Sequence, residues 1–362
     1  MKIIAIVVGT RPEIIKLAPV IKYCRQIRFP FYLIHTGQHY SENMDAVFFK
    51  QMKLPKPDFY LGVGSGTHGQ QTGRIMVKIE KILLQKRPFA IMVQGDTNTV
   101  LATSLVASKL YIRISHVEAG LRSYDKSMPE EINRVVSDHL SYYLFPPTER
   151  AKKNLYKEGI NNNVFVTGNT IVEALSENLK YAEKIEASIL KNYRLEKNKY
   201  ILLTLHRQEN VDNKNRLKEV LSGINAVKKI TGMQILFPAH PRTVKMIKQF
   251  GFVKDIETTK IIEPVGYFEF LALEKNARII LTDSGGIQEE SCILKIPCVT
   301  LRENTERPET LDVGSNILAG WKKENIISSS EKMLNKKDGW ENPFGDGTAS
   351  IKIMEIIKKE AL

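Results

Sequence analysis

Short apolar segments rich in Val, Ile and Leu alternate along this chain with longer segments in which apolar positions recur at helical spacing. A continuous apolar run of about four to eight residues is typical of a strand buried on both faces, and helices between such strands indicate parallel sheets. The predicted strands fall into two series. The first comprises residues 3–8, 31–36, 90–94, 112–117, 142–145 and 164–167, and the second comprises residues 200–205, 234–237, 260–262, 279–281 and 297–301.

Helical periodicity is clearest at residues 12–27, 70–85, 97–110 and 130–141. Two series of strands would be unusual in one open sheet, and 362 residues suffice for two domains. We therefore predict an α/β protein with two Rossmann-like doubly wound domains. A long polar helical pattern at residues 169–186 indicates the boundary. The expected domains are residues 1–169 and 170–347, with a terminal helix at about 348–362 that packs back on the first domain.

The composition narrows the classes of function. The net charge is +13, but the 53 Lys and Arg residues are scattered, which favours a solvated basic surface that attracts an anionic substrate over a nucleic-acid groove. No apolar run approaches the roughly 18 residues of a membrane span, so no membrane partner is expected. Cys24, Cys292 and Cys298 form no CxxC pair and fit a reducing cytosol. Without HExxH or GxSxG motifs, neither a metal site nor a serine hydrolase is predicted.

The most informative segment is RIILTDSGGIQEE at residues 278–290. A buried strand ends here, turns through Ser284, Gly285 and Gly286, and opens a helix that carries Glu290. The free N–H groups at a helix N-terminus bind anions, and glycines let a phosphate approach closely. Glu290 is suited to a ribose diol, and Arg307 offers a fixed cation. The segment predicts a nucleotide diphosphate site; the alternative is a Gly-rich turn without a ligand.

The first strand ends in GTRPE, with Lys16 one turn into the following helix. Arg11 and Lys16 are candidate phosphate ligands, and the alternative for Arg11 is a surface ion pair with Glu13. The GxGxxG match at residues 64–69 follows only a weak strand candidate and lacks the downstream acid of a dinucleotide site. We interpret it as a flexible loop and expect no nicotinamide cofactor.

Three carboxylates occupy positions where ligands of parallel sheets bind. Asp96 and Glu118 follow the third and fourth strands, and Glu130 opens a helix. In a shared crevice, burial and mutual repulsion raise carboxyl pKa values and suit such groups to acid–base chemistry. Singly, each is equally suited to a cap or salt bridge. His206 and His240 end strands of the second series and are candidates for phosphate contact or proton transfer.

Together these motifs closely resemble the non-hydrolysing UDP-N-acetylglucosamine 2-epimerases. The resemblance covers essentially the whole chain. It rests on GTRPEIIKLAP near the start, TGQHY at 36–40, QGDTNTVLA at 94–102, HVEAGLRS at 116–123, PEEINR at 129–134, GNT at 168–170, LHRQEN at 205–210, TDSGGIQEE at 282–290 and TERPE at 305–309. It implies a two-domain fold of the GT-B type with a central cleft, a homodimer, and a cytoplasmic role in supplying polysaccharide precursors.

The resemblance also implies a mechanism and a set of site residues. UDP leaves C1 of the sugar while the C2 proton is removed, giving a 2-acetamidoglucal intermediate, and UDP adds back after reprotonation on the other face. This route needs no cofactor and no metal. The catalytic residues would be Asp96, Glu118, Glu130 and His206. The UDP ligands would be Arg11, Lys16, Phe270 (against uracil), Ser284, Gly285, Gly286, Glu290 and Arg307.

Some members of the resembled family bind a second substrate molecule as an activator. Gln38, His39, Arg207 and His240 match that second site, whereas Ser41 and Gln70 replace an expected amide and arginine, which argues against activation. The segments at 35–44 and 66–75 are also similar to those of enzymes that act on UDP-diacetamido uronic acids. A related UDP-sugar is therefore an alternative substrate, and a glycosyltransferase with the same fold is the alternative function.

Overall fold

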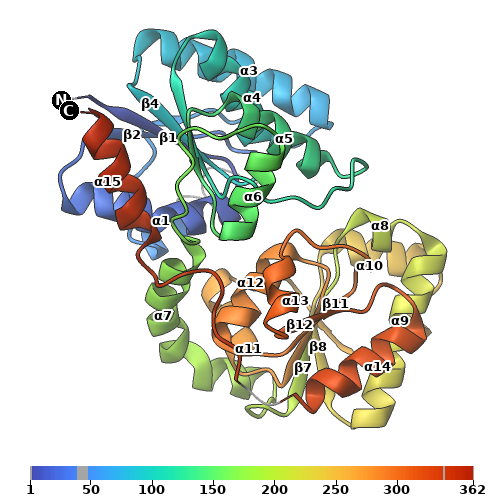
Figure 1. Cartoon of the computed structure of the whole chain (residues 1–362). Coiled ribbons are helices and arrows are strands. Elements are labelled where there is room, and N and C mark those ends of the chain that lie inside the picture. Colours follow the sequence, from blue (N-terminus) through green and yellow to red (C-terminus); the bar gives the residue numbers. More distant parts are fainter. Residues whose placement is uncertain (1, 39–47, 337–338, 362) are drawn as a thin grey trace. The chain divides into compact units, whose positions relative to one another are not determined.

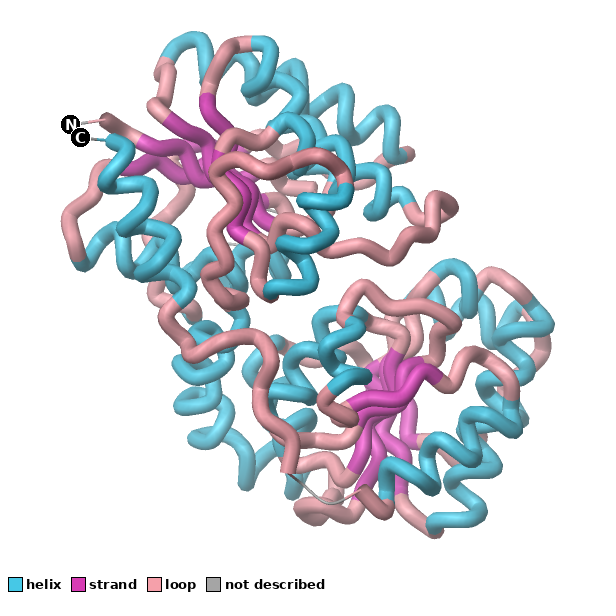
Figure 2. The backbone as a smooth tube through the Cα atoms, viewed as in Figure 1, coloured by secondary structure: helices cyan, strands magenta, loops and turns pink. Residues whose placement is uncertain are grey.

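The computed structural model describes residues 2–38, 48–336 and 339–361. The chain forms two compact units, which we call unit 1 (Met1–Ala174 with Phe344–Leu362) and unit 2 (Leu175–Pro343). Each unit has a parallel sheet between layers of helices, as Figure 2 shows by its colours. The predicted class, α/β with two Rossmann-like doubly wound domains, is confirmed.

Unit 1 contains a sheet in the order β3-β2-β1-β4-β5-β6. All its strand pairs are parallel. One core cluster packs alternate strand residues, among them Val7, Ile34 and Val93, against Ile79 of α3 and Val100 of α4. The strands are β1 (Ile4–Val8), β2 (Phe31–His35), β3 (Phe59–Tyr60), β4 (Ala90–Gln94), β5 (Arg113–Val117) and β6 (Tyr143–Phe145), and the helices are α1 (Arg11–Gln26), α3 (His68–Gln85), α4 (Asn98–Lys109), α5 (Pro129–Leu140), α6 (Glu149–Lys157) and α15 (Ala349–Ala361).

Unit 2 repeats this architecture with the order β12-β11-β10-β7-β8-β9. The central strands β7 and β10 are completely buried, as their unbroken apolar runs predict. The strands are β7 (Tyr200–Thr204), β8 (Gln234–Pro238), β9 (Lys260–Ile262), β10 (Ile279–Thr282), β11 (Cys298–Thr300) and β12 (Asn316–Leu318), and the helices are α8 (Gln208–Val211), α9 (Lys214–Thr231), α10 (Pro241–Gln249), the 3₁₀ turn η1 (Lys254–Ile256), α11 (Tyr267–Lys275), α12 (Gly285–Leu294), α13 (Pro308–Asp312) and α14 (Lys323–Leu334).

Threonine side chains cap the N-termini of two helices of unit 1. Thr97 accepts hydrogen bonds from the N–H groups of Thr99 and Val100 at the start of α4, and Thr67 accepts one from Gln70 at the start of α3. In α1, Pro12 occupies the first turn, where its missing N–H has no cost. The short connections from β1 to α1 and from β4 to α4 hold the carboxyl ends of these strands close to the helix N-termini.

Three strand predictions differ from the structure. Residues 164–167 were predicted as a strand, but they make only an isolated bridge between Leu144 and Val164. This segment is extended beyond the edge strand β6 and makes too few ladder hydrogen bonds to count as a strand. Conversely, β12 was not predicted and β3 was noted only as a weak strand candidate; these strands have three and two residues.

The chain passes from unit 1 to unit 2 and later returns to unit 1. Helix α7 (Ile171–Asn192) begins in unit 1 and continues in unit 2. The chain returns to unit 1 with α15, which packs on α1; in Figure 1 it is the red helix beside that blue helix. Glu173 caps α15 by accepting hydrogen bonds from the backbone and hydroxyl of Ser350. No helix among the described residues is long and apolar enough to span a bilayer.

Candidate active site

The polar loops of unit 1 gather at the carboxyl edge of its sheet. Strands β1, β4 and β5 are neighbours in the order of the sheet, and Gln94 pairs in register with Val117. Asp96 and Glu118, each just beyond the end of its strand, are therefore brought to one edge. Helix α1, which carries Lys16, begins at the same edge after β1. The structure thus assembles three of the predicted residues that lie far apart in the sequence.

Glu118 is the most constrained of these residues. Its φ of +72° lies in the left-handed region, which non-glycine residues seldom adopt. The side chain is buried, and Oε1 accepts hydrogen bonds from Lys16 Nζ at 2.5 Å and from Asn169 Nδ2 at 3.1 Å. Gln94 donates to Oε2. A strained backbone that is maintained by the surrounding contacts is typical of a functional position.

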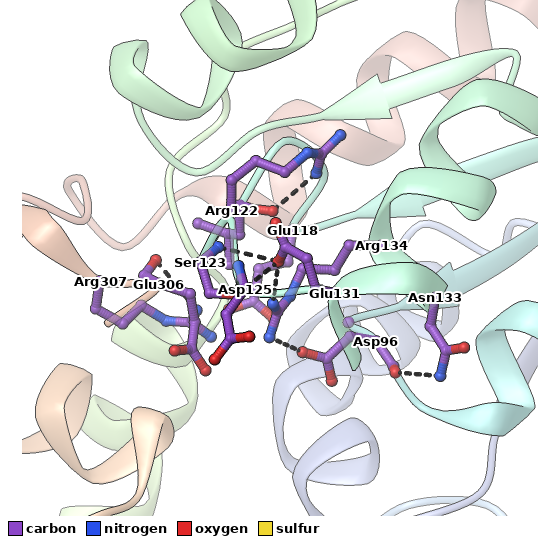
Figure 3. Close-up of polar contacts among 12 residues, drawn as sticks. Asp96, Glu118, Arg122, Ser123, Asp125, Glu131, Asn133, Arg134, Glu306 and Arg307 are labelled. Carbon is purple, nitrogen blue, oxygen red and sulfur yellow. Dashed lines mark hydrogen bonds and ion pairs between the residues drawn. The ribbon is translucent and has the colours of Figure 1, made fainter. Parts of the chain in front are cut away.

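Asp96 is held by two successive residues of α5 (Figure 3). Asn133 Nδ2 donates to the Asp96 carbonyl oxygen at 2.9 Å, and the Arg134 guanidinium pairs with the Asp96 carboxylate. The Asp96 side chain is 28% exposed, so its carboxylate remains accessible while its direction is fixed. Sequence reasoning missed Asn133 and Arg134, although both lie within the PEEINR motif.

Glu130 and Glu131 divide the first turn of α5 between exposed and buried positions. Glu130 is partly exposed. Glu131 is buried and accepts hydrogen bonds from the N–H groups of Ser123 and Tyr124 and from Arg134 at 2.7 Å. Glu131 therefore ties the loop that follows Glu118 to α5, while Glu130 is the accessible acid at the helix start.

Glu13 was considered only as a surface ion-pair partner of Arg11, and that alternative is wrong because Glu13 is buried. Its carboxylate accepts hydrogen bonds from the N–H groups of Gly9 and Thr10 and from the hydroxyls of Thr10 and Thr97. Burial raises the pKa of Glu13 to about 7, against the opposing effect of these hydrogen bonds. Arg11 lies over the Phe48 ring, with Cζ 5.6 Å from the ring centroid.

In unit 2, His206 follows β7 and Asp283 follows the neighbouring strand β10. Asp283 is fully buried, and its carboxylate lies 3.2 Å from His206 Nδ1 while accepting the backbone N–H groups of His206 and Arg207. This contact orients the imidazole, whose side chain is 44% exposed. A histidine that is held by a buried carboxylate and still open to solvent is suited to proton transfer or anion contact.

Helix α12 begins at Gly285, with Ser284 as its N-cap. A Cβ at Gly286 would meet no atom within 4 Å, so this turn leaves open space for a ligand beside the helix N-terminus. A Cβ at Gly285 would instead lie 3.0 Å from Glu306 Oε1. Glu290 lies within the same helix. The pKa values of Tyr267 and Glu274 are raised mainly by the burial of these two residues and next by the charge of Glu290.

Arg307 is less available than the sequence suggested. It is buried, and its Nε lies 2.5 Å from Oε1 of the fully buried Glu289. The ion pair fixes one side of the guanidinium next to α12. Any phosphate contact would therefore be made by a guanidinium whose orientation this ion pair already fixes.

A hollow of about 200 Å³ lies at the carboxyl ends of β7 and β8. Phe270 and Val265 provide apolar lining, and His206 and His240 provide polar lining. The hollow combines an aromatic wall with ring nitrogens, an arrangement that suits a flat, polar heterocycle.

The residues of the predicted second site have partners of their own. Gln38 is buried, and its side-chain oxygen accepts a hydrogen bond from the Thr99 hydroxyl at 2.8 Å. Arg207 lies 3.7 Å from the Glu306 carboxylate. His240 caps α10 by accepting a hydrogen bond from the N–H of Arg242. The pKa of His240 is lowered mainly by burial and, to a smaller extent, by the nearby His206. His39 and Ser41 lie outside the described residues. Among the described residues no cluster of three or more His, Cys, Asp or Glu is suited to a metal ion.

Two parallel doubly wound units with acids, cations and a glycine-rich helix N-terminus at their strand ends are typical of enzymes that bind nucleotides. The comparisons with known proteins specify the class further. Residues 22–358 match the protein family described as UDP-N-acetylglucosamine 2-epimerase. The chain is 57% identical to the UDP-N-acetylglucosamine 2-epimerase of Methanocaldococcus jannaschii, over 98% of both chains.

Two further relatives bear on the site. A crystal structure of the Methanocaldococcus jannaschii UDP-GlcNAc 2-epimerase in complex with UDP-GlcNAc and UDP superimposes with a TM-score of 0.93 at 56% identity, covering 99% of each chain. The UDP-2,3-diacetamido-2,3-dideoxy-D-glucuronate 2-epimerase of Pseudomonas aeruginosa is 39% identical, over 99% of this chain and 100% of its own. The chain belongs to the UDP-N-acetylglucosamine 2-epimerase family, which confirms the prediction from the motifs; it is an isomerase.

Proposed function

We propose that this protein interconverts UDP-N-acetylglucosamine and UDP-N-acetylmannosamine by eliminating UDP and adding it back. The observation that carries the proposal is Glu118, a buried carboxylate held at a φ of +72° beside Lys16 at the same sheet edge as Asp96. An epimerase that works through proton transfer needs such positioned acids. A glycosyltransferase with the same fold needs at most one base.

The chemistry explains why both acids and cations are required. The C2 proton has no adjacent carbonyl and is too weakly acidic for direct removal. When the C1–O bond breaks, UDP takes the electron pair, and the positive charge that develops at C1 acidifies C2–H. A base removes that proton, and a C1–C2 double bond forms. Return of a proton to the opposite face of C2 and attack of a UDP oxygen on C1 complete the reaction without net oxidation.

Asp96, Glu118 and Glu130 are the groups we assign to proton transfer at the sugar. Asp96 is accessible and oriented by Arg134, Glu130 is partly exposed, and Glu118 is buried against a cation. These different environments suit the three carboxyl groups to separate roles as acid and base. A positioned acid or base typically raises the rate of a proton-transfer step by about 100- to 10,000-fold. His206, oriented by Asp283, completes the proposed catalytic set.

The proposed UDP ligands follow from the strand ends of both units. In unit 2, the N-terminus of α12 with Ser284, Gly285 and Gly286 would bind phosphate, and Glu290 would accept the ribose hydroxyls. The hollow lined by Phe270 would hold the uracil ring. Arg307, Arg11 and Lys16 would supply positive charge to the leaving diphosphate, which stabilises UDP as it departs.

Two substrates are supported to different degrees. The UDP-N-acetylglucosamine 2-epimerase of Methanocaldococcus jannaschii is 57% identical, whereas the diacetamido-glucuronate epimerase of Pseudomonas aeruginosa is 39% identical. We therefore favour UDP-N-acetylglucosamine over the uronic acid. We further propose that the enzyme is a cytoplasmic homodimer that supplies precursors of cell-surface polysaccharide.

The test is incubation of purified protein with UDP-N-acetylglucosamine in deuterated water, with chelator and without added cofactor. We expect UDP-N-acetylmannosamine to form and deuterium to enter at C2. Epimerisation with complete retention of the C2 proton would exclude the elimination route. Faster turnover of the UDP-diacetamido uronic acid would assign the other substrate, and transfer of the sugar to an added acceptor with release of UDP and no epimerisation would assign a glycosyltransferase.

A further inference from the structure

A buried histidine beneath the proposed acids has no role in the chemistry described so far. His116 lies in β5, and its side chain is 1% exposed. Its Nδ1 lies 2.7 Å from Oδ1 of Asp138, and its Nε2 lies 2.8 Å from the carbonyl oxygen of Gly95. The ring therefore has one hydrogen-bond partner on each side.

Both partners of the ring are acceptors. A carbonyl oxygen has only lone pairs to offer, and a neutral imidazole carries only one N–H. Asp138 is also bound as an anion, because its Oδ2 accepts from Arg122 at 2.7 Å and from the N–H of Gly120 at 3.1 Å. Only an imidazolium, with two N–H groups, satisfies both contacts of His116.

The surrounding charges agree with this assignment. Burial, and to a smaller extent Arg122, oppose a charge on His116, but the Asp138 carboxylate and the Gly95 carbonyl together outweigh them and raise the pKa of the imidazole. Burial likewise acts to raise the pKa of Asp138, and His116 and Arg122 together lower it. Arg122 forms a second ion pair with Glu158 at 2.7 Å, and His139 lies 3.9 Å from Glu158. With His116 charged, the series His116, Asp138, Arg122 and Glu158 alternates in charge and sums to zero.

The two ends of the His116–Asp138 pair hold the two turns that carry the strand-end acids. Gly95, which receives the His116 N–H, has a φ of +82° and directly precedes Asp96. Gly120, which donates to Asp138, has a φ of +81° and follows Glu118 by two residues. A single ion pair therefore fixes backbone atoms on both sides of the proposed catalytic edge.

We propose that His116, as a charged imidazolium paired with Asp138, is a positioning residue. It holds the turns that carry Asp96 and Glu118 in the relative position that proton transfer requires. This role rests on the proposed epimerisation. A buried ion pair contributes little to stability compared with well-packed apolar residues, so its contribution here is the geometry of the two turns. Because reacting groups displaced by about 1 Å can lose about 100-fold in rate, such a contribution appears in turnover.

The protonation state is tested on the wild-type protein. In protein labelled with ¹⁵N-histidine, both ring nitrogens of His116 should show protonated chemical shifts at pH 8, with the resonances assigned by their loss in His116→Gln. The other histidines of the chain should include neutral rings at this pH. A single unprotonated nitrogen on His116 would overturn the proposal. This measurement needs neither substrate nor activity, so it stands even if the enzyme acts on another sugar.

The positioning role is tested by His116→Gln, Asp138→Asn and the double variant, with His139→Gln as the matched control. His139 is also a histidine of unit 1, but it is 46% exposed and lies outside the His116–Asp138 pair. We expect kcat per folded molecule to fall about 10- to 100-fold in each single variant, with UDP affinity unchanged. The fall in kcat of the double variant should be no larger than that of the more impaired single variant, because the two residues act as one unit.

A purely structural role would give a different pattern. It would lower the melting temperature and leave kcat per folded molecule at the wild-type value, and that result would overturn the proposal. If wild-type protein fails to epimerise UDP-N-acetylglucosamine, the proposed function fails, while the NMR result still decides the state of His116.

Discussion

The Nζ atom of Lys16 lies 2.5 Å from Oε1 of Glu118, although 102 positions separate the two residues in the sequence. Both side chains are buried, at 8% and 4% exposure. The pair joins the helix after β1 to the loop after β5, so that a cation assigned to the leaving group touches an acid assigned to the sugar. Removal of either charge would therefore leave the other charge buried without its counter-ion.

Lys16→Met should leave the Glu118 carboxylate buried without its cation. We expect a loss of about 3–5 kcal/mol in the free energy of unfolding, the usual cost of removing one partner of a buried pair. The double variant Lys16→Met/Glu118→Gln should recover part of this loss, because no uncompensated charge remains. Urea denaturation measures both. Lys199→Met is the control, since Lys199 is 71% exposed in its pair with Glu196, and it should leave the free energy of unfolding almost unchanged.

The amides Asp96→Asn, Glu118→Gln and Glu130→Gln should each lower turnover per folded molecule by about 100-fold or more. Affinity for UDP should change little, because none of the three is assigned to the phosphates. Steady-state kinetics, calorimetry with UDP and thermal melting separate the effects. Glu149→Gln, which changes an acid that is 69% exposed, should remain fully active. A destabilised variant with full activity would remove that residue from the catalytic set.

Arg307→Ala should weaken UDP binding about 10- to 100-fold, because a charge-assisted contact contributes roughly 1.5–3 kcal/mol. The same change leaves Glu289 buried without its cation, so the melting temperature should also fall. Glu289→Gln should restore stability to the Arg307→Ala protein without restoring affinity. Calorimetry well below the melting temperature is the measurement, and unchanged UDP affinity in Arg307→Ala would contradict the assignment.

His35 should make stability depend on pH. Burial lowers its pKa from 6.5 to about 4, and its Nδ1 accepts the N–H of Gly37 at 3.0 Å, which requires an unprotonated nitrogen. Between these pKa values the unfolded chain binds more protons than the folded protein. The contribution of His35 is therefore present above about pH 6.5 and is lost as pH falls toward 4, by about 3 kcal/mol in all.

The check on His35 is urea denaturation of wild type and His35→Gln between pH 4 and 7. The difference between their free energies of unfolding should shift by the amount given above as the pH falls. His139→Gln, which changes a partly exposed histidine, should show little such shift. A difference that stays constant over this range would show that His35 titrates alike in the folded and unfolded protein.

Most of the fold was predictable because buried parallel strands have unbroken apolar runs. Strands β1, β4, β7 and β10 are buried at every position, so their sequences leave little ambiguity. The short edge strands β3 and β12 bury few residues; β12 was missed, and β3 was recognised only as a weak candidate. The extended residues 164–167 carry the same apolar pattern as a strand, and only the lack of a hydrogen-bonded neighbour beyond one bridge distinguishes them.

The candidate site was predictable only at the level of position. Residues just after parallel strands meet at one edge, and this rule found Asp96, Glu118 and His206. The same rule could not identify the residues that hold these three side chains. Arg134 and Asp283 act through side-chain direction, the left-handed backbone of Glu118 depends on tertiary contacts, and Glu13 looked like a surface residue from its charge.

The return of α15 to unit 1 has a consequence for the order in which the protein is made. Ile353, Met354 and Ile357 of this helix are buried, and Met354 contacts Cys24 of α1. A ribosome releases all of residues 175–343 before these residues emerge. Unit 2 is thus able to close its core during translation while the face of α1 that α15 later covers is still exposed. Unit 1 is begun before unit 2 and completed after it.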